Sequence, residues 1–147
     1  MYNRILVATD GSSLSDKAVK SAIALASTCG AELVALRIVP RNALSYWDAG
    51  VTIPISEYER IEAQWQAEGQ AGVDKAKKLA QAAGVSAKAV TVRSNIVSDG
   101  ILAAAKKHKC DLIVMASHGR KGIKRLILGS ETQGVLAHTT LPVLVLR

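Results

Sequence analysis

Two short segments of this chain carry the residues best suited to chemistry, and each contains glycine. The first is Asp10-Gly11-Ser12, which directly follows a short apolar run. A carboxylate at a strand end can hold a metal ion or a ribose hydroxyl, and Ser12 or Ser13 can cap a helix whose N-terminus favours anions. An ordinary turn fits the same residues, with Gly11 supplying the bend. The segment is neither a Walker A loop nor a dinucleotide fingerprint, because the Gly-Lys-Ser/Thr ending and the further glycines are missing.

The second segment is Ala116-Ser117-His118-Gly119, followed after nine residues by Gly129-Ser130. Glycine allows the backbone to approach a ligand closely, and Gly129-Ser130 opens an expected helix whose first N–H groups point outward. Two glycine sites and a helix start that face one crevice would suit phosphate groups. The alternative is that both glycines are turn residues and that Ser130 is an ordinary N-cap.

The elements that must position these segments alternate along the chain. Five short runs typical of strands are separated by four segments with helical spacing. The expected strands are 5–9, 32–39, 87–93, 111–116 and 142–146, and the expected helices are 13–29, 56–83, 97–108 and 130–138. Strict alternation predicts an α/β three-layer sandwich with a five-stranded, doubly wound parallel sheet. Ligands of such sheets bind outside the carboxyl ends of the strands.

Local signals predict where these helices begin and end. Gly30 and Gly84 are expected to end the first two helices. Ser56-x-x-Glu59 and Ser130-x-x-Gln133 match capping boxes. The connection 41–55 is long for a loop between a strand and a helix. It contains Tyr46 and Trp47, which either pack the loop down or cover a ligand or partner, whereas Trp65 is expected to pack in the second helix.

Length and composition predict one domain spanning residues 1–147. Hydrophobic residues make up 49% of the chain, but aromatic residues only 3%, so the core must be aliphatic. Apolar runs stay well short of the roughly 20 residues that cross a membrane, and the start does not resemble a secretory signal. Cys29 and Cys110 do not form a disulfide framework and are expected to be small buried residues. We therefore expect a cytoplasmic protein.

The positive charge lies in the second half of the chain. Residues 1–73 hold 6 Lys/Arg and 8 Asp/Glu (−2), and residues 74–147 hold 13 and 4 (+9). Most of these lysines are expected on solvated helix faces. The cluster Arg120, Lys121, Lys124 and Arg125 is a candidate for anion binding, but a surface loop fits equally well. Nucleic-acid binding ranks last, because the chain offers no aromatic-rich stacking surface.

The histidines carry no clear catalytic pattern. His118 is expected to pack or to form hydrogen bonds, because no acid partner at fixed spacing supports general-base chemistry. His108 and His138 lie near expected helix ends, where partial positive charge suits the helix dipole.

The whole chain resembles the universal stress protein family. The resemblance lies in RILVATDGS, ELVALRIVP, DLIVMASHGRKG and LILGSETQGVLAHTTLPVLVLR. It implies a Rossmann-like or flavodoxin-like fold of the adenine nucleotide alpha hydrolase-like type. Nucleotide-binding members carry Gly-x2-Gly-x9-Gly-Ser/Thr, and the matching positions are Ala116, Gly119, Gly129 and Ser130. Ala116 departs from the family glycine, and its methyl group disfavours a positive φ.

The resemblance also implies a role for each matching residue in binding ATP or AMP, with or without Mg²⁺. Ala8, Thr9 and Asp10 would line the ribose or metal region, with Asp10 as the candidate metal ligand. Ile38 and Val39 would pack on adenine, and Met115 and Ala116 would flank the base and sugar. The phosphates would be surrounded by His118, Gly119, Gly129, Ser130, Glu131 and Thr132. Asn95 would take a loop position where the family usually has glycine, and the last strand would pair with its copy in a homodimer.

These expectations favour an adenine-nucleotide-binding stress sensor or regulator over a fast enzyme. Any ATP hydrolysis should be slow, because no residue clearly positions a water molecule. A nucleotide-free dimeric scaffold of the same family is the first alternative, and Ala116 is the residue that favours it. A nucleotidyl transferase is the second, but the sequence shows no activating group for it.

Overall fold

The computed structural model describes residues 1–41, 53–119 and 127–147. Strands and helices alternate along the chain, as expected. The strands are β1 (Arg4–Ala8), β2 (Glu32–Val39), β3 (Ala87–Arg93), β4 (Leu112–Ala116) and β5 (Val143–Leu146), and the helices are α1 (Ser13–Cys29), α2 (Ile55–Ala82), α3 (Val97–Lys107) and α4 (Ser130–His138).

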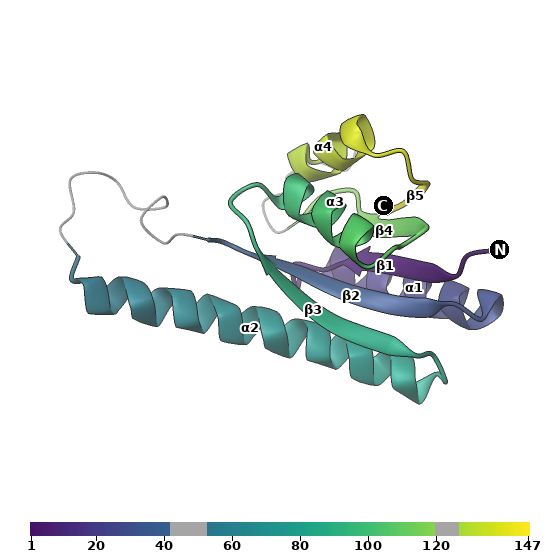
Figure 1. The fold of residues 1–147 in the computed structure, drawn as a ribbon, viewed down its shortest axis with the longest axis horizontal. Helices are drawn as coiled ribbons and strands as arrows, with labels where there is room; N and C mark the ends of the chain where they lie inside the picture. The colour runs from purple at the N-terminus through teal and green to yellow at the C-terminus, as the bar shows by residue number, and fades with distance from the viewer. Residues whose placement is uncertain (42–52, 120–126) are drawn as a thin grey trace.

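The five strands form one parallel sheet in the order β3-β2-β1-β4-β5. Helices α1 and α2 cover one face of the sheet, and α3 and α4 cover the other (Figure 1). The predicted doubly wound sandwich is therefore confirmed. The chain builds outward from β1 to β3 and then returns to β4 on the other side of β1, so the switch point lies between β1 and β4. Strand β5 lies at an edge of the sheet.

The core is aliphatic, as the composition predicted, and the sheet divides it into two layers. Ile5, Val7 and Leu33 face α1 and α2, whereas Leu6, Val34 and Ile113 face α3 and α4, and all six side chains are fully buried. Adjacent residues of a strand point to opposite faces, so a strand buried on both sides consists almost entirely of apolar residues. This is why the strands appear as continuous apolar runs in the sequence.

Three helix termini follow the sequence signals, but both predicted capping boxes are wrong. Ser12 caps α1 by accepting a hydrogen bond from the Ser15 amide, and Gly30 and Gly84 adopt positive φ angles of 67° and 76°. Helix α2 begins at Ile55 after Pro54, and α4 begins at Ser130 after Gly129, in both cases without a side-chain cap. In the second box, the side-chain amide of Gln133 donates to the Leu128 carbonyl rather than capping the helix. In the first turn of α2, Glu57, which is not part of the predicted box, pairs with Arg60 at 2.8 Å.

A charged network ties the amino ends of the strands together. Arg4 binds the Glu32 carboxylate at 2.9 Å and donates to the His108 carbonyl, and Lys88 approaches Glu32 at 3.4 Å. Burial raises the pKa of Glu32, but Arg4 and Lys88 together outweigh it and hold that pKa below its ordinary value. The same network affects His108. Burial, followed by Lys107, Lys88 and Arg4, lowers the His108 pKa, so the partial positive charge expected there is disfavoured.

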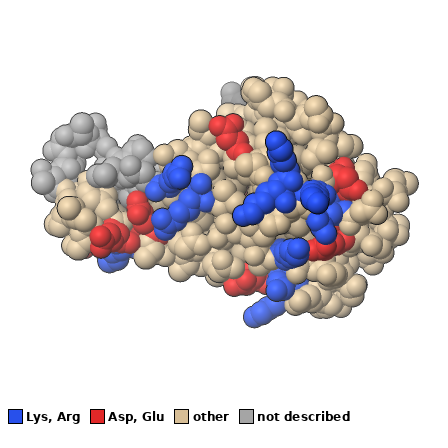
Figure 2. Space-filling model, viewed as in Figure 1, with Lys and Arg blue, Asp and Glu red and all other residues tan. Residues whose placement is uncertain are grey.

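Charged side chains elsewhere fit a solvated surface. On the face of the molecule shown in Figure 2, Lys and Arg lie in separate groups, with Asp and Glu between them. Lys106 and Lys107 occupy the last turn of α3, where positive charge complements the helix dipole. Cys110 is buried, and burial raises its pKa to about 11, which fits an inert core thiol. In the described ranges no helix is both long and apolar enough to span a membrane.

We predict that Glu32→Gln lowers the free energy of unfolding at pH 7 by about 1 kcal/mol, the size of a typical hydrogen-bonded interaction. Because the folded-state pKa of Glu32 lies below 4.5, the contribution is present above that pH and is lost as the pH falls through the folded value. Urea unfolding of both proteins from pH 3 to 7 measures this difference. Glu57→Gln is the control, since the pair Glu57–Arg60 is exposed. Equal effects of the two substitutions at pH 7 would contradict the prediction.

Candidate functional site

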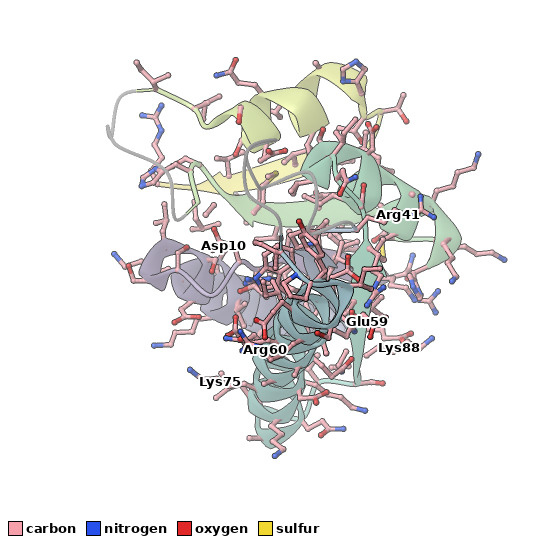
Figure 3. All side chains as sticks on the ribbon, turned by 90° about the vertical axis from the view of Figure 1, so that its left-hand side faces the viewer. Asp10, Arg41, Glu59, Arg60, Lys75 and Lys88 are labelled. Carbon is pink, nitrogen blue, oxygen red and sulfur yellow. The ribbon has the colours of Figure 1, made fainter. Side chains whose placement is uncertain are left out.

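A cavity of about 260 Å³ opens at the carboxyl ends of the strands, where β1 and β4 diverge. Its lining comes from the ends of β1, β2 and β4 and from the first turns of α3 and α4. Figure 3 looks toward this end of the molecule and labels Asp10 beside the start of α1. The cavity therefore occupies the position where ligands bind in open α/β sheets.

The segment after β1 is held by hydrogen bonds within itself. Asp10 Oδ1 accepts a hydrogen bond from the Ser12 amide at 2.9 Å, which forms a tight turn over Gly11. Thr9 is buried, and its hydroxyl lies 3.1 Å from that of Ser15 and accepts from the Gly11 amide. One carboxylate oxygen of Asp10 thus has a structural role, and the side chain is fixed at the cavity wall.

The segment after β4 is held from two sides. The Ser117 amide donates to the Leu146 carbonyl of β5, and the Ser117 carbonyl accepts from the Gly129 amide, both at 2.7 Å. The Thr132 hydroxyl donates to the carbonyl of Ala116 at 2.9 Å. These bonds join the end of β4 to the start of α4, so the backbone of the second motif segment has a fixed place in the cavity wall.

His118 lies in this segment with one ring nitrogen already engaged. Its Nδ1 is 3.2 Å from the Ser117 hydroxyl. Nδ1 and Nε2 are separate hydrogen-bonding positions, so this contact leaves Nε2 for another group. The side chain is half-buried and lines the cavity. This geometry suits a hydrogen-bonding residue, as the sequence predicted.

The two motif glycines each lie in close contact with other parts of the protein. A Cβ atom at Gly119 would collide with Asp10 Oδ2, and one at Gly129 would lie 3.2 Å from both the His118 Cα and the Ser117 carbonyl oxygen. Neither residue has a positive φ, since the glycines with that conformation in the described ranges are Gly11, Gly30 and Gly84. Close packing, and not backbone conformation, is the reason for glycine at both positions.

The opposite wall of the cavity is apolar. Ile38 from β2 and Met115 from β4 face the α3 side of the sheet, where Val97 and Ile101 of α3 complete the wall. Gly100 brings α3 close to β2, because a Cβ at this position would lie 2.7 Å from Ile38 Cδ1. A flat apolar group would fit against this wall, and polar groups would face Asp10, His118 and the start of α4.

Ten of the thirteen predicted binding residues line this one cavity. They are Ala8, Thr9, Asp10, Ile38, Met115, Ala116, His118, Gly119, Glu131 and Thr132. Val39 does not, because it points to the other face of β2, where its Cγ2 lies against Gly69 of α2. Gly129 and Ser130 lie just outside the lining and shape it through the backbone.

Six further residues line the cavity beyond the thirteen named as binding residues: Ser15, Leu36, Arg37, Pro40, Val97 and Ile101. Strand alternation pairs Leu36 with Ile38 on one face, so the period of two could have identified it and excluded Val39. Pro40 follows the end of β2, where ligand contacts are expected. Val97 and Ile101 are one helical turn apart, but the sequence does not show which strand their helix crosses.

The structure also bears on the expectations for Asn95 and Trp65, which lie outside the cavity lining. Asn95 does not adopt the left-handed conformation, since the non-glycine residue with positive φ in the described ranges is Lys109. Asn95 instead accepts a hydrogen bond from the Arg41 amide. Trp65 is half-buried in α2. The expectations for Tyr46, Trp47 and the cluster Arg120, Lys121, Lys124 and Arg125 fall outside the described residues.

The candidate metal ligand Asp10 is not part of a larger ligand set. Among the described residues, no group of three or more His, Cys, Asp or Glu side chains is placed to hold a metal ion. Mg²⁺ commonly uses one or two carboxylates together with substrate phosphates. Asp10 alone therefore fits an ion that enters with a phosphorylated ligand better than a permanently bound one.

Comparison with known proteins identifies the family. A model of the Universal stress protein family matches residues 1–147. The chain belongs to this family. It is 35% identical to universal stress protein YxiE of Bacillus subtilis, over the full length of both, and 33% identical to MJ0531 of Methanocaldococcus jannaschii, over all of this chain and 83% of that protein.

Solved structures of the family have the same fold. The structure of MJ0577 of Methanocaldococcus jannaschii matches 99% of this chain and 96% of its own, with 26% identity and a TM-score of 0.83. A universal stress protein solved in complex with cAMP matches 99% of this chain and 97% of its own, with 25% identity and a TM-score of 0.73. The predicted family and fold are thereby confirmed.

We predict that Gly119→Ala destabilises the ligand-free protein by about 1 kcal/mol, because the new methyl group displaces the Asp10 carboxylate from its bond to the Ser12 amide. Thermal unfolding without nucleotide measures the change. In an Asp10→Ala background the same substitution should cost much less, since the colliding group is gone. A cost that is unchanged in that background would show that Asp10 is not the cause.

Proposed function

We propose that this universal stress protein binds an adenine nucleotide, ATP or AMP, in the cavity between β1 and β4. The observation that carries the proposal is the division of one cavity into an apolar wall and a polar wall at the switch point of the sheet. Ile38 and Met115 offer a surface for a base, and Asp10 lies where a ribose hydroxyl or a phosphate-bound Mg²⁺ would be held. The relative solved with cAMP supports an adenine nucleotide as the class of ligand.

Phosphate groups would lie near the start of α4 and the loop after β4. The first N–H groups of a helix have no partner within the helix, and the helix dipole favours anions there. Gly119 allows the loop backbone to come close, and His118 Nε2 offers a further contact. Glu131 and Asp10 line the same cavity, so phosphate binding there would benefit from a cation that offsets their charge.

Binding, and not fast turnover, is the activity we infer. Rapid phosphoryl transfer needs a metal ion, a positioned water molecule and cationic clamps together. Within the described part of the lining, Asp10 could supply a metal ligand, but the Arg37 side chain packs toward Gly69 of α2 and so offers no clamp in the cavity. ATP hydrolysis should therefore be slow, and the protein would act as a sensor or regulator.

We also infer a homodimer through β5. This strand lies at the edge of the sheet, and Leu144 on β5 and Leu136 on α4 are 40% and 42% exposed. An apolar edge strand is a template for pairing with another strand, and pairing with a second copy would cover it. Sedimentation equilibrium of the purified protein measures the assembly, and a monomer at all concentrations would contradict this inference.

We predict that the purified protein releases adenine nucleotide on denaturation, detected by mass spectrometry, and that calorimetry shows binding of AMP and ATP. Titration with and without Mg²⁺ shows whether the ion enters with the phosphates. Asp10→Asn should weaken binding, because the amide keeps the oxygen that accepts from the Ser12 amide but lacks the charge. Asp16→Asn, at the exposed first turn of α1, is the matched control and should leave affinity unchanged.

No released nucleotide and no heat at millimolar ligand would contradict the proposal and favour the nucleotide-free scaffold. Ala116 is the observation that favours this second function. It belongs to β4, pairs with Leu146 and has no positive φ, so alanine causes no backbone strain there. Its methyl group reaches a cavity wall where the family motif has hydrogen.

We predict that Ala116→Gly changes the affinity for AMP by less than about threefold, because a single methyl group at an unstrained position is a small change in the wall. Titration of both proteins with AMP is the measurement. A gain of a hundredfold or more would show that Ala116 blocks the site and that the scaffold is the native function.

A further inference from the structure

We propose that Thr132 is a positioning residue for phosphate recognition: its hydroxyl group holds the first turn of α4 against the end of β4, so that the backbone of both faces the ligand correctly. The inference rests on the proposed nucleotide function and deepens it. It departs from the direct phosphate contact that the resemblance implies for Thr132.

The hydroxyl group of Thr132 is committed to the protein backbone. The residue is 2% exposed, and its Oγ1 donates to the carbonyl of Ala116 at 2.9 Å and to that of Ser117 at 3.2 Å. A hydroxyl has a single proton, so the two carbonyls share it. No proton is then left for donation to a phosphate oxygen.

The two carbonyls belong to the segment that forms the polar wall of the cavity. Ser117 is also bound through its amide to Leu146 and through its carbonyl to the Gly129 amide. The Thr132 hydroxyl and the Gly129 amide thus reach the same carbonyl from the start of α4. Together they fix the distance between the first turn of this helix and the following residues His118 and Gly119.

Loss of this hydroxyl should weaken contacts to the phosphate more than contacts to the base. Phosphate would be bound by backbone N–H groups of α4 and by the loop after β4, and the strength of these bonds depends on their alignment. The base would lie against Ile38 of β2 and Met115 of β4, with Val97 and Ile101 of α3 beside it. Thr132 binds the end of β4 but neither β2 nor α3, so contacts to the base should be weakened much less than contacts to the phosphate.

The test compares AMP with adenosine, which lacks the phosphate, by calorimetry on Thr132→Val and Thr132→Ser. Valine keeps the shape of the side chain without the hydroxyl, and serine keeps the hydroxyl. Thr132→Val should weaken AMP binding by roughly tenfold, the equivalent of one hydrogen bond, and adenosine binding by less than about twofold. Thr132→Ser should restore the wild-type ratio of the two affinities.

Thr139→Val is the matched control, because the Thr139 hydroxyl accepts a hydrogen bond from the Leu141 amide at the opposite end of α4. It should leave the ratio unchanged even if it lowers the melting temperature. If Thr132→Val does not fold, Thr132→Ala removes the same hydroxyl and is measured in the same way.

Each remaining outcome has a distinct meaning. An equal loss of AMP and adenosine affinity in Thr132→Val, or no loss of either, overturns the positioning role while nucleotide binding stands. A failure of Thr132→Ser to restore the ratio also overturns it, and so does a loss in Thr139→Val as large as that in Thr132→Val. If the wild-type protein binds neither AMP nor adenosine, the proposed function and this inference are both wrong.

Discussion

The carbonyl of Ser117 is the point on which the functional end of this molecule depends. It lies one residue beyond β4 and accepts hydrogen bonds from the Gly129 amide and the Thr132 hydroxyl, while the amide of the same residue is bound to the last strand. A backbone segment bound in this way from two elements has little freedom to shift. This part of the cavity wall is consequently held by bonds within the protein, which would lower the cost of ordering on binding a ligand.

The charged side chains that line the described part of the cavity do not by themselves suit a phosphate group. Asp10 and Glu131 bring carboxylates to the wall where phosphate would lie, whereas the Arg37 side chain leaves β2 on the face that packs against Gly69 of α2. Unit charges a few ångströms apart near a protein surface interact by several kcal/mol, so uncompensated carboxylates would repel a phosphate strongly. A Mg²⁺ ion held between Asp10 and a phosphate would reverse the sign of that interaction. A ligand with more phosphate groups would be repelled more strongly by these carboxylates, so its binding would depend more on Mg²⁺.

The sequence predicted the architecture well because the physics of a buried parallel sheet is repetitive. The central strands β1 and β4 are apolar on both faces, and each crossover between parallel strands needed a helix, so alternation alone left few arrangements. For the same reason, most residues named from the strand ends lie around one cavity. Val39 was assigned wrongly because two adjacent apolar residues were treated alike, although only one of them can face the cavity.

Other features depend on distances between elements, which sequence patterns do not encode. The capping boxes fail because the chain enters α2 and α4 from directions set by Pro54 and by the close approach of Gly129 to the end of β4. The hydrogen bonds of Arg4 to Glu32 and His108 join residues 28 and 104 positions apart. The two carbonyls that engage Thr132 lie 15 and 16 positions earlier in the chain.

The motif glycines show why family membership and ligand binding are separate questions. Gly119 and Gly129 are needed by contacts within the protein itself, with Asp10 and with the backbone after β4, whether or not a nucleotide is present. A chain that had lost its ligand would therefore still be more stable with glycine at both positions. Ala116 differs, because β4 accepts alanine without strain and the residue meets the cavity directly. The two glycines are thus explained by contacts within the protein, whereas the side chain at position 116 would meet a ligand directly.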